Sequence, residues 1–221
     1  MSSFLAYGQA QQEQLLAALG QHVVLVLIAV LLSIALAIVI TAVLYKAPKV
    51  GEYVQASLSA LYAVPSLALF ALCIPLLGIG HATAIIVLIA YNQFLLVRNF
   101  TAGLAEVDPG LVEASRSLGL NGLQTFLYIQ LPLAVPVFIA GIRLATISTI
   151  GIATIASLID AGGLGVLLFS GLRTSNLDQL LWATLLAAAL ALSANTLLTG
   201  AEYLFGHTPP FKLFKRKHLT S

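Results

Sequence analysis

The chain has 221 residues, of which 60% are hydrophobic and 8% are charged, and its mean hydropathy is +1.02. A soluble domain carries about a quarter charged residues, so this composition excludes an ordinary soluble protein and indicates a surface that faces lipid. The formal charge of +2 is too small to suggest nucleic acid as a partner. The single cysteine, Cys73, excludes an intrachain disulfide and a thiolate metal cluster. We therefore predict an all-α polytopic membrane protein.

The N-terminal segment 1–20 carries no Lys or Arg and precedes an apolar run that is longer than a signal-peptide core. The apolar run is therefore expected to remain as a membrane anchor. Two forms are open for segment 1–20: a short amphipathic helix on the outer surface, or a solvated tail.

Crossing the hydrocarbon layer takes about 20 apolar residues, and the sequence offers five such stretches. We predict spans near 22–45, 54–78, 82–104, 133–158 and 179–204. The second stretch contains Pro65 and Pro75, which remove backbone donors and should bend it. Bends of this kind often line a pathway, which makes Pro65 a candidate pathway residue.

The basic residues predict the orientation of these spans. With five spans, one side of the membrane receives Lys46, Lys49, Arg98, Arg116, Lys212, Lys215, Arg216 and Lys217. The other side receives Arg173, and Arg143 falls within a span. The positive-inside rule places the basic side in the cytoplasm, so the N-terminus is expected outside and the C-terminus inside. The chain then divides into an extracytoplasmic tail 1–20, one transmembrane domain 21–204 and a basic cytoplasmic tail 205–221, which either contacts anionic lipid or simply anchors the topology.

The loop 105–132 is a polar interruption that local rules shape into two helices. Asp108 is a good N-cap, Pro109 suits the first helical position, and Gly119 suits a left-handed C-cap, which predicts a helix from Pro109 to Leu118. Asn121 and Gln124 have the spacing of a capping box and predict a second helix toward Leu131, with Pro132 opening the fourth span. A narrow face of the first helix then either docks on another protein or packs beneath the chain's own spans; its residues are Leu111, Ala114, Ser115 and Leu118.

The same loop resembles the cytoplasmic coupling motif in the membrane subunits of bacterial ABC importers, through Glu113, Ala114, Ser115, Gly119 and the run 129–132. The resemblance implies that Glu113, Ala114 and Gly119 contact an ATPase subunit. Ser115 stands where Ala is commonest in that family. The resemblance favours docking over internal packing.

Further matches narrow the resemblance to permeases for glycine betaine, carnitine, choline and related quaternary amines. They lie in 64–70, 76–80, 91–92, 98–99, 131–136, 140–143, 151–159 and 161–165. The resemblance implies a type I ABC importer transmembrane domain in the bacterial cell membrane. Its implied partners are ATPase subunits that use ATP and Mg, a second permease subunit in a homo- or heterodimer, and an extracytoplasmic solute-binding protein. This chain itself would bind no cofactor. Because the run 151–165 also resembles methionine permeases, a methionine or other small-solute importer is the alternative.

Several intramembrane residues are candidates for the gate or the pathway. The resemblance implies an outer gate at Gly162, Gly163 and Gly165, although an ordinary tight turn would need the same residues. Tyr91 is a candidate for cation–π contact with a quaternary amine, and core packing is the alternative for it and for its aromatic neighbours Tyr62, Phe70 and Phe94.

Arg143 lies about 16 Å into the fourth span, near mid-depth, where a charge is costly. It either tunes the pathway or pairs structurally with a carboxylate such as Asp160 or with helix carbonyls. We expect the structural role, because a cation in the route of a cationic solute would repel it.

An enzymatic function is not expected. The sequence has no nucleotide-binding Gly-rich Lys motif, and His22, His81, His207 and His218 are scattered near the ends of the predicted spans rather than spaced as metal ligands. A passive channel is disfavoured, because it would need no docking loop.

Overall fold

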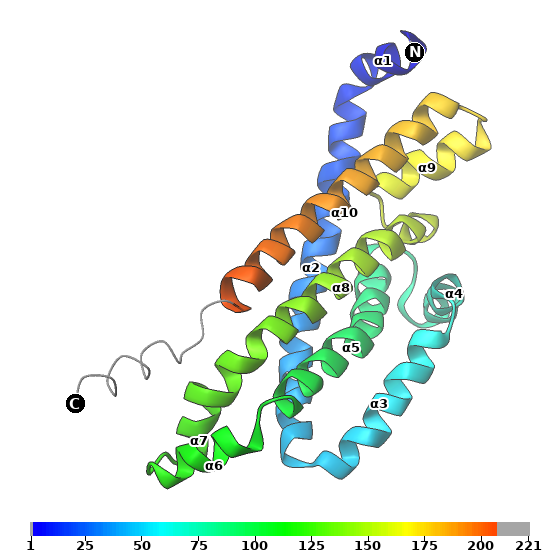
Figure 1. The fold of residues 1–221 in the computed structure, drawn as a ribbon. Helices are drawn as coiled ribbons and strands as arrows, with labels where there is room; N and C mark the ends of the chain where they lie inside the picture. Colours follow the sequence, from blue (N-terminus) through cyan, green and yellow to red (C-terminus); the bar gives the residue numbers. More distant parts are fainter. Residues whose placement is uncertain (1, 207–221) are drawn as a thin grey trace, which may run out of the picture.

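The computed structural model describes residues 2–206, and every regular element in that part of the chain is a helix (Figure 1). This confirms the all-α prediction. The basic residues of the predicted cytoplasmic tail, from Lys212 onward, lie outside the described residues. In chain order the helices are α1 (Ser2–Ala10), α2 (Gln12–Lys46), α3 (Pro48–Ala63), α4 (Ser66–Leu77), α5 (His81–Ala105), α6 (Pro109–Ser117), α7 (Gly122–Thr125), α8 (Leu131–Ala156), α9 (Leu164–Arg173) and α10 (Leu177–Gly206).

Four helical stretches of the described chain are long and apolar enough to cross a membrane, and the pair α3 and α4 makes a fifth if the two helices are counted as one broken span. The four stretches are Gln12–Lys46, His81–Ala105, Gly122–Ile159 and Leu177–Phe205. They match the first, third, fourth and fifth predicted spans in position. The short helix α9 was not predicted from the sequence, which indicated only an outer connection there.

The second predicted span is broken in two. The helices on either side of Val64 and Pro65 meet at an angle of 97°. A residue before proline is pushed toward extended backbone, and Val64 has φ −67° and ψ 130°. The bend predicted at Pro65 is therefore confirmed, whereas Pro75 lies inside α4.

The N-terminal segment is helical, and its position on the outer surface stays a prediction. Helix α2 begins at Gln12, ten residues before the predicted start of the first span at His22. Helix α1 lies against the start of α10, where the ring of Phe4 stacks on Trp182 with centroids 4.7 Å apart. The indole Nε1 of Trp182 also donates a hydrogen bond to the Phe4 carbonyl, at 2.9 Å.

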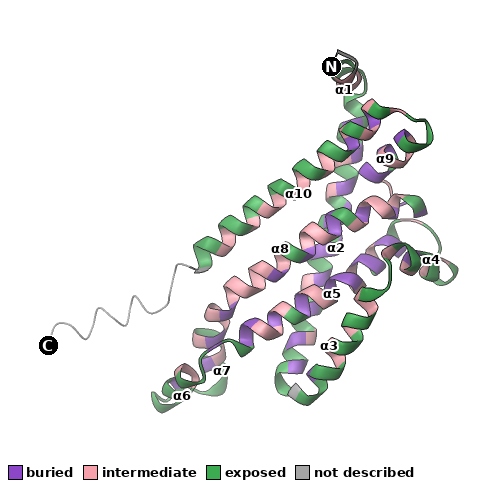
Figure 2. Ribbon diagram, turned by 45° about the vertical axis from the view of Figure 1, so that its right-hand side comes forward, coloured by how far each residue is buried: buried purple, intermediate pink, exposed green. Residues whose placement is uncertain are grey.

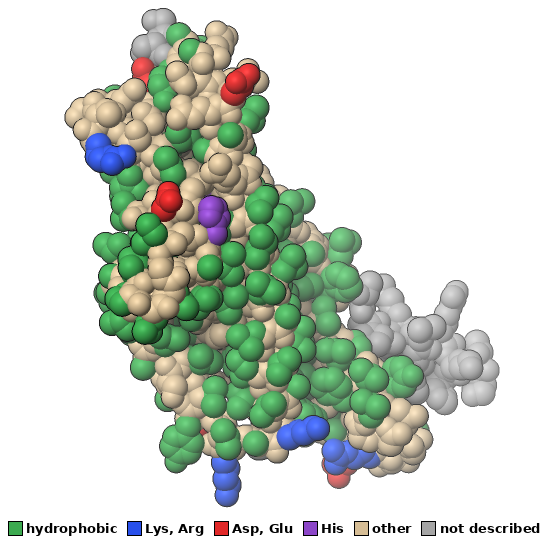
Figure 3. Space-filling view, turned by 180° about the vertical axis from the view of Figure 1, so that it is seen from behind, with side chains coloured by type: hydrophobic (Ala, Val, Ile, Leu, Met, Phe, Trp, Pro, Cys, Tyr) green, Lys and Arg blue, Asp and Glu red, His purple; other side chains and the backbone are tan. Residues whose placement is uncertain are grey.

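The buried core runs along α2, α5 and α8, which carry most of the buried positions in Figure 2. Its largest cluster includes Leu25, Phe70, Leu88 and Ile150. The outside of the bundle is also apolar: Leu31 is 64% exposed and Leu197 is 74% exposed. Figure 3 shows this hydrophobic surface over the middle of the molecule, as expected for a bundle solvated by lipid.

The two ends of the bundle carry different connections. One end holds α1 and α9, and the opposite end holds the α2–α3 connection together with α6 and α7 (Figure 1). Lys46, Lys49 and Arg116 therefore belong to one end, and Lys and Arg side chains gather there in Figure 3. The arrangement agrees with the predicted grouping of basic residues, and the orientation in the membrane stays a prediction.

A buried polar network joins the three central helices. Asn92 on α5 donates to Ser33 Oγ on α2 at 3.1 Å and accepts from Thr149 Oγ1 on α8 at 2.9 Å. All three side chains are at most 1% exposed. Because hydrocarbon offers no replacement partner, this chain of hydrogen bonds sets the register of the helices against one another.

Replacing Thr149 with Val should destabilise the bundle, because the Asn92 amide oxygen loses its donor in a dry environment. We expect a loss of about 1 kcal/mol, seen as a lower melting temperature of the purified protein. Thr184→Val is the matched control: Thr184 is exposed and its hydroxyl bonds within its own helix, to the Leu180 carbonyl. Equal melting temperatures for the two variants would contradict a structural role for the network.

Candidate functional site

The helix α6 forms as the local rules predict. The Asp108 carboxylate accepts a hydrogen bond from the Gly110 amide at 2.8 Å and so caps the helix. At the other end Gly119 has φ +87°, and the Leu120 amide donates to the Ser115 carbonyl at 3.2 Å. The predicted helix is confirmed to within one residue at its C-terminal end.

The second helix begins as predicted but does not stop where predicted. Both hydrogen bonds of the Asn121–Gln124 capping box are present, each at 2.9 Å. The helix then continues through a π-helical turn, Phe126–Gln130, directly into α8. Pro132 lies in the first turn of α8, as predicted, but the preceding helix does not end before it. A proline near a helix start can be tolerated, and the wide turn before it keeps the helix continuous from Gly122 to Ile159, over 38 residues.

We call residues 106–130 the elbow. Of its four predicted coupling residues, Glu113, Ala114 and Gly119 are exposed. Ser115 is only 3% exposed: its hydroxyl donates to the Val112 carbonyl at 2.7 Å and lies 3.0 Å from the Thr125 hydroxyl. Ser115 therefore joins α6 to α7 from the inside of the elbow instead of facing outward. Sequence spacing placed Ala114 and Ser115 on one face, open either to docking or to internal packing, and it did not identify Thr125 as the partner of Ser115.

The exposed side of the elbow is uneven and carries both polar and apolar side chains. Leu118 and Leu123 are 69% and 67% exposed. Beside Glu113 lies a hollow of about 380 Å³, whose lining includes Val107, Val112 and Arg116. The elbow is also tied to α2, because the Tyr45 hydroxyl donates to Gln130 Oε1 at 2.7 Å. Together these features make a concave, partly apolar surface at the end of a long helix.

Two of the candidate pathway residues lie together. The hydroxyl of buried Tyr91 donates to the carbonyl of Val64, the residue that precedes Pro65. Tyr91 thereby holds the break between α3 and α4 against α5. Its ring also meets Tyr62 edge-on at 5.6 Å, and Tyr62 lies 4.8 Å from Phe94. The structure thus gathers three aromatic rings that the sequence alone showed only as separate positions.

The three candidate glycines form a second group, between α2 and the α8–α9 connection. Gly163 has φ +79°, and its amide donates to Gln21 Oε1 at 3.1 Å. A Cβ at Gly163 would lie 2.9 Å from His22 Nδ1, and one at Gly165 would collide with the Thr154 carbonyl. Gly162, with φ +70°, also faces Gln21. These glycines are needed for close approach of the backbone.

His22 is a residue whose position sequence reasoning missed. It was expected near a helix end, but it lies within α2, fully buried, with Nε2 3.2 Å from the Ile150 carbonyl oxygen. The contact joins α2 to α8 beside Gly163. Within residues 2–206, no group of three His, Cys, Asp or Glu side chains is placed to hold a metal ion.

Arg143 pairs with a carboxylate, although not the predicted one. Its Nη2 lies 3.2 Å from Glu202 Oε2 on α10, and its Nη1 donates to Asn195 Oδ1 at 3.4 Å. The example suggested from the sequence, Asp160, lies instead in the turn after α8, with φ +64°. The two paired side chains are 28% and 32% exposed, so the contact is only partly shielded. It joins α8 to α10.

If Arg143 is structural, removing either partner should weaken the contact between α8 and α10. We expect Arg143→Gln and Glu202→Gln each to lower the melting temperature, and the double variant to lose less than their sum, with a coupling of about 1 kcal/mol. Arg173→Gln, at an exposed arginine of α9, is the control. Normal stability of Arg143→Gln combined with altered uptake would instead assign Arg143 to the pathway.

Comparison with known proteins agrees with this geometry. Residues 29–207 match the family described as binding-protein-dependent transport system inner membrane component. The carnitine transport permease protein OpuCB of Listeria monocytogenes is 37% identical over 203 residues, covering 92% of this chain and 93% of that protein. The glycine betaine/carnitine/choline transport system permease protein OpuCB of Bacillus subtilis (strain 168) is 33% identical over 202 residues, covering 91% and 93%.

The fold is also found among solved structures. An inward-facing structure of the MetNI methionine ABC transporter superposes with a TM-score of 0.80 over 89% of this chain and 98% of that chain. Its sequence identity is 19%, so the likeness concerns the fold alone.

Membership of the family implies ATPase and binding-protein partners, and it makes the chain a transport component and not an enzyme. The matched region covers the central helices, the elbow and both groups of candidate gate residues. The chain belongs to the family of binding-protein-dependent transport system inner membrane components, and it is a multi-pass permease subunit of an ABC importer.

Proposed function

We propose that this permease forms the translocation pathway for quaternary-amine osmoprotectants such as glycine betaine, carnitine and choline. The observation that carries the substrate is the similarity, over nine-tenths of both chains, to permeases whose names specify carnitine, or glycine betaine, carnitine and choline. The likeness to a methionine transporter rests on shared fold at 19% identity and gives no comparable support for methionine.

The elbow is the proposed docking surface for the ATPase. Glu113, Ala114 and Gly119 lie exposed on it, beside the hollow near Arg116. Ser115 supports the surface from within by its contact with Thr125. Because α7 runs without a break into α8, movement of a docked elbow would rotate or tilt the whole 38-residue helix. Closure of the ATPase subunits would thereby reach the core of the bundle.

The two groups of candidate gate residues lie on elements that contact α8, the helix continuous with the elbow. Pro65 and Tyr91 set the break in the second span, and Gly162, Gly163 and Gly165 hold α2 against the α8–α9 connection. A tilt of α8 would move the connection against α2 and so change access from the end that carries α1 and α9. This is the proposed route from the elbow to the outer gate.

The remaining parts of the proposal concern assembly. The pathway forms between this chain and a second permease subunit, identical or related. ATP and Mg are used by the ATPase subunits, and this chain binds no cofactor. Residues 1–20 face the extracytoplasmic side with the solute-binding protein, 21–204 form the transmembrane domain with coupling loop 105–132, and 205–221 form the basic cytoplasmic tail.

Uptake measurements test the substrate. In proteoliposomes that contain the complete importer, radiolabelled glycine betaine should accumulate in an ATP-dependent manner. Excess unlabelled carnitine or choline should compete with it, and methionine should not. Competition by methionine alone would favour the alternative permease class, and uptake that persists without the ATPase subunits would indicate a passive channel.

A bulky side chain on the elbow should prevent docking. We expect Ala114→Trp to reduce copurifying ATPase about tenfold, because the enlarged side chain at this exposed position would no longer fit a groove on the ATPase. Leu177→Trp is a matched control at an exposed position at the start of α10, at the opposite end of the bundle. Ser115→Ala should keep the ATPase bound and lower only the melting temperature. Full ATPase binding by Ala114→Trp would contradict docking at this surface.

A further inference from the structure

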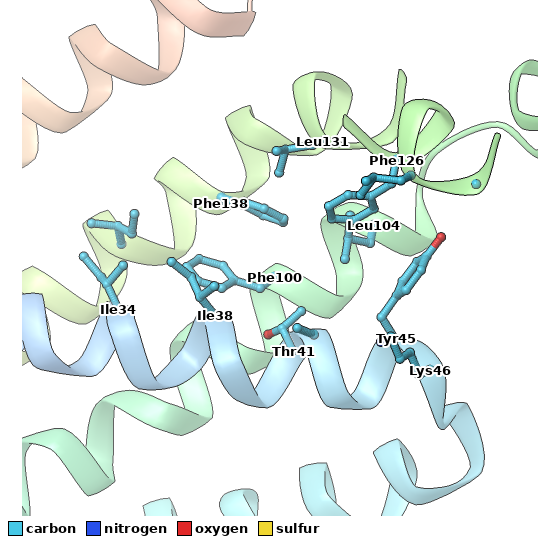
Figure 4. Close-up of a pocket in the computed structure, with 14 residues that line it drawn as sticks. Ile34, Ile38, Thr41, Tyr45, Lys46, Phe100, Leu104, Phe126, Leu131 and Phe138 are labelled. Atoms are coloured by element: carbon cyan, nitrogen blue, oxygen red, sulfur yellow. The ribbon is translucent and has the colours of Figure 1, made fainter. Parts of the chain in front are cut away.

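A large apolar groove lies between α2, α5, α8 and the elbow, and the proposed transport function does not use it. Its volume is about 670 Å³. In Figure 4 the side chains of α2, among them Ile38 and Thr41, point across the groove toward Phe138 and Leu131 of α8. Phe100 and Leu104 of α5 line it too, and Phe126 stands at the elbow end. Ile38 is 56% exposed, so the groove opens on the side of the bundle that faces lipid.

The length of the groove matches one leaflet of a bilayer. On α2 it extends from Ile34 to Lys46. Twelve residues of helix rise about 18 Å, and half of the hydrocarbon layer is about 15 Å. The groove therefore runs from near the bilayer centre to the interface at the end of the bundle that carries the elbow.

The charge within the groove lies at its interfacial end. Of the fourteen residues that line it, Lys46 carries the only charge, and it lies in the last turn of α2. The neighbouring residue Tyr45 donates a hydrogen bond from its hydroxyl to Gln130 of the elbow. Deeper in, the buried Thr41 hydroxyl has no hydrogen-bond partner among the described residues. An apolar groove with one cation at its interfacial end suits an amphiphile that has an apolar chain and an anionic head group.

We propose that this groove holds an acyl chain of an anionic phospholipid of the inner leaflet, with the phosphate at Lys46. A polar zwitterionic solute is unsuited to these apolar walls. A lysine near the membrane surface attracts anionic lipid. Because Gly122, Leu123 and Phe126 of the elbow form part of the same wall, the bound chain supports the elbow against α2. The lipid is then part of the contact between the elbow and α2.

Photocrosslinking in nanodiscs tests the proposal independently of transport. The complete importer would be reconstituted in phosphatidylcholine with a trace of phosphatidylglycerol that carries a diazirine on one acyl chain. After illumination, mass spectrometry should find the label on groove residues such as Ile38, Ala42 or Phe138. Unlabelled phosphatidylglycerol should compete better than phosphatidylcholine.

Matched variants test the contact with the lipid phosphate separately from the binding of the acyl chain. Lys46→Gln should lower the preference for phosphatidylglycerol about fivefold, whereas Lys49→Gln, at a lysine that does not line the groove, should leave it unchanged. Ala42→Trp should fill the groove and abolish labelling, and Val43→Trp, at the exposed neighbouring position outside the groove, should not. Ala42→Leu is a milder filling variant, expected to reduce labelling if Ala42→Trp does not assemble.

Three outcomes would overturn the proposal. Labelling spread evenly over the lipid-facing helices would mean that the groove holds no particular lipid. An unchanged preference in Lys46→Gln would exclude the phosphate contact. Label on other lipid-facing residues but on none of the groove residues would show that no acyl chain enters the groove.

Discussion

Hydrocarbon offers no hydrogen-bond partner to a protein, and this constraint explains the main features of the chain. Backbone groups are satisfied within helices, and the polar side chains that remain must find one another. Ser33, Asn92 and Thr149 do so across three helices, and Arg143 does so with Glu202 and Asn195. Each of these contacts also determines which helix faces are adjacent. In a bundle whose outside is as apolar as its core, such polar contacts supply specificity that hydrophobic burial cannot.

The same constraint makes the break in the second span informative. The residues around Pro65 lack the continuous hydrogen bonding of a helix, and the Tyr91 hydroxyl takes up the freed Val64 carbonyl. A broken helix at membrane depth is tolerated where protein supports it in this way. Tyr91 is therefore part of the support of the break, and any contact of its ring with a solute would have to be compatible with that hydrogen bond.

The proposed docking surface for the ATPase and the proposed lipid groove meet at the elbow. Its outer surface is exposed, its two short helices are joined internally by Ser115 and Thr125, and its second helix is continuous with α8. On its inner side it borders the apolar groove and bonds to Tyr45. The elbow is thus continuous with α8 and also in contact with α2, as the proposed transmission of movement requires. Its stiffness comes from tertiary contacts, because an isolated helix of nine residues would be marginal in water.

The sequence by itself determined the helical class, four of the spans, the bend at Pro65 and the caps of the elbow. These depend on composition, apolar length and hydrogen bonds between residues a few positions apart, which are local properties. The family resemblance also came from motifs whose residues lie close together along the sequence. The early start of α2 at Gln12 and the helical continuity before Pro132 were not predicted, because helix ends depend on neighbouring elements as well as on local signals: α1 and α10 pack together, and a π-helical turn precedes the proline.

Only the tertiary structure decided which residues meet. Three contacts show this: Ser115 with Thr125, His22 with Ile150, and Arg143 with Glu202. They join residues 10, 128 and 59 positions apart, on separate elements. Periodicity tells that a residue is on one face of a helix, but not which helix covers that face. That choice follows from the packing of the whole bundle, because each polar side chain must reach a partner that its own helix cannot supply.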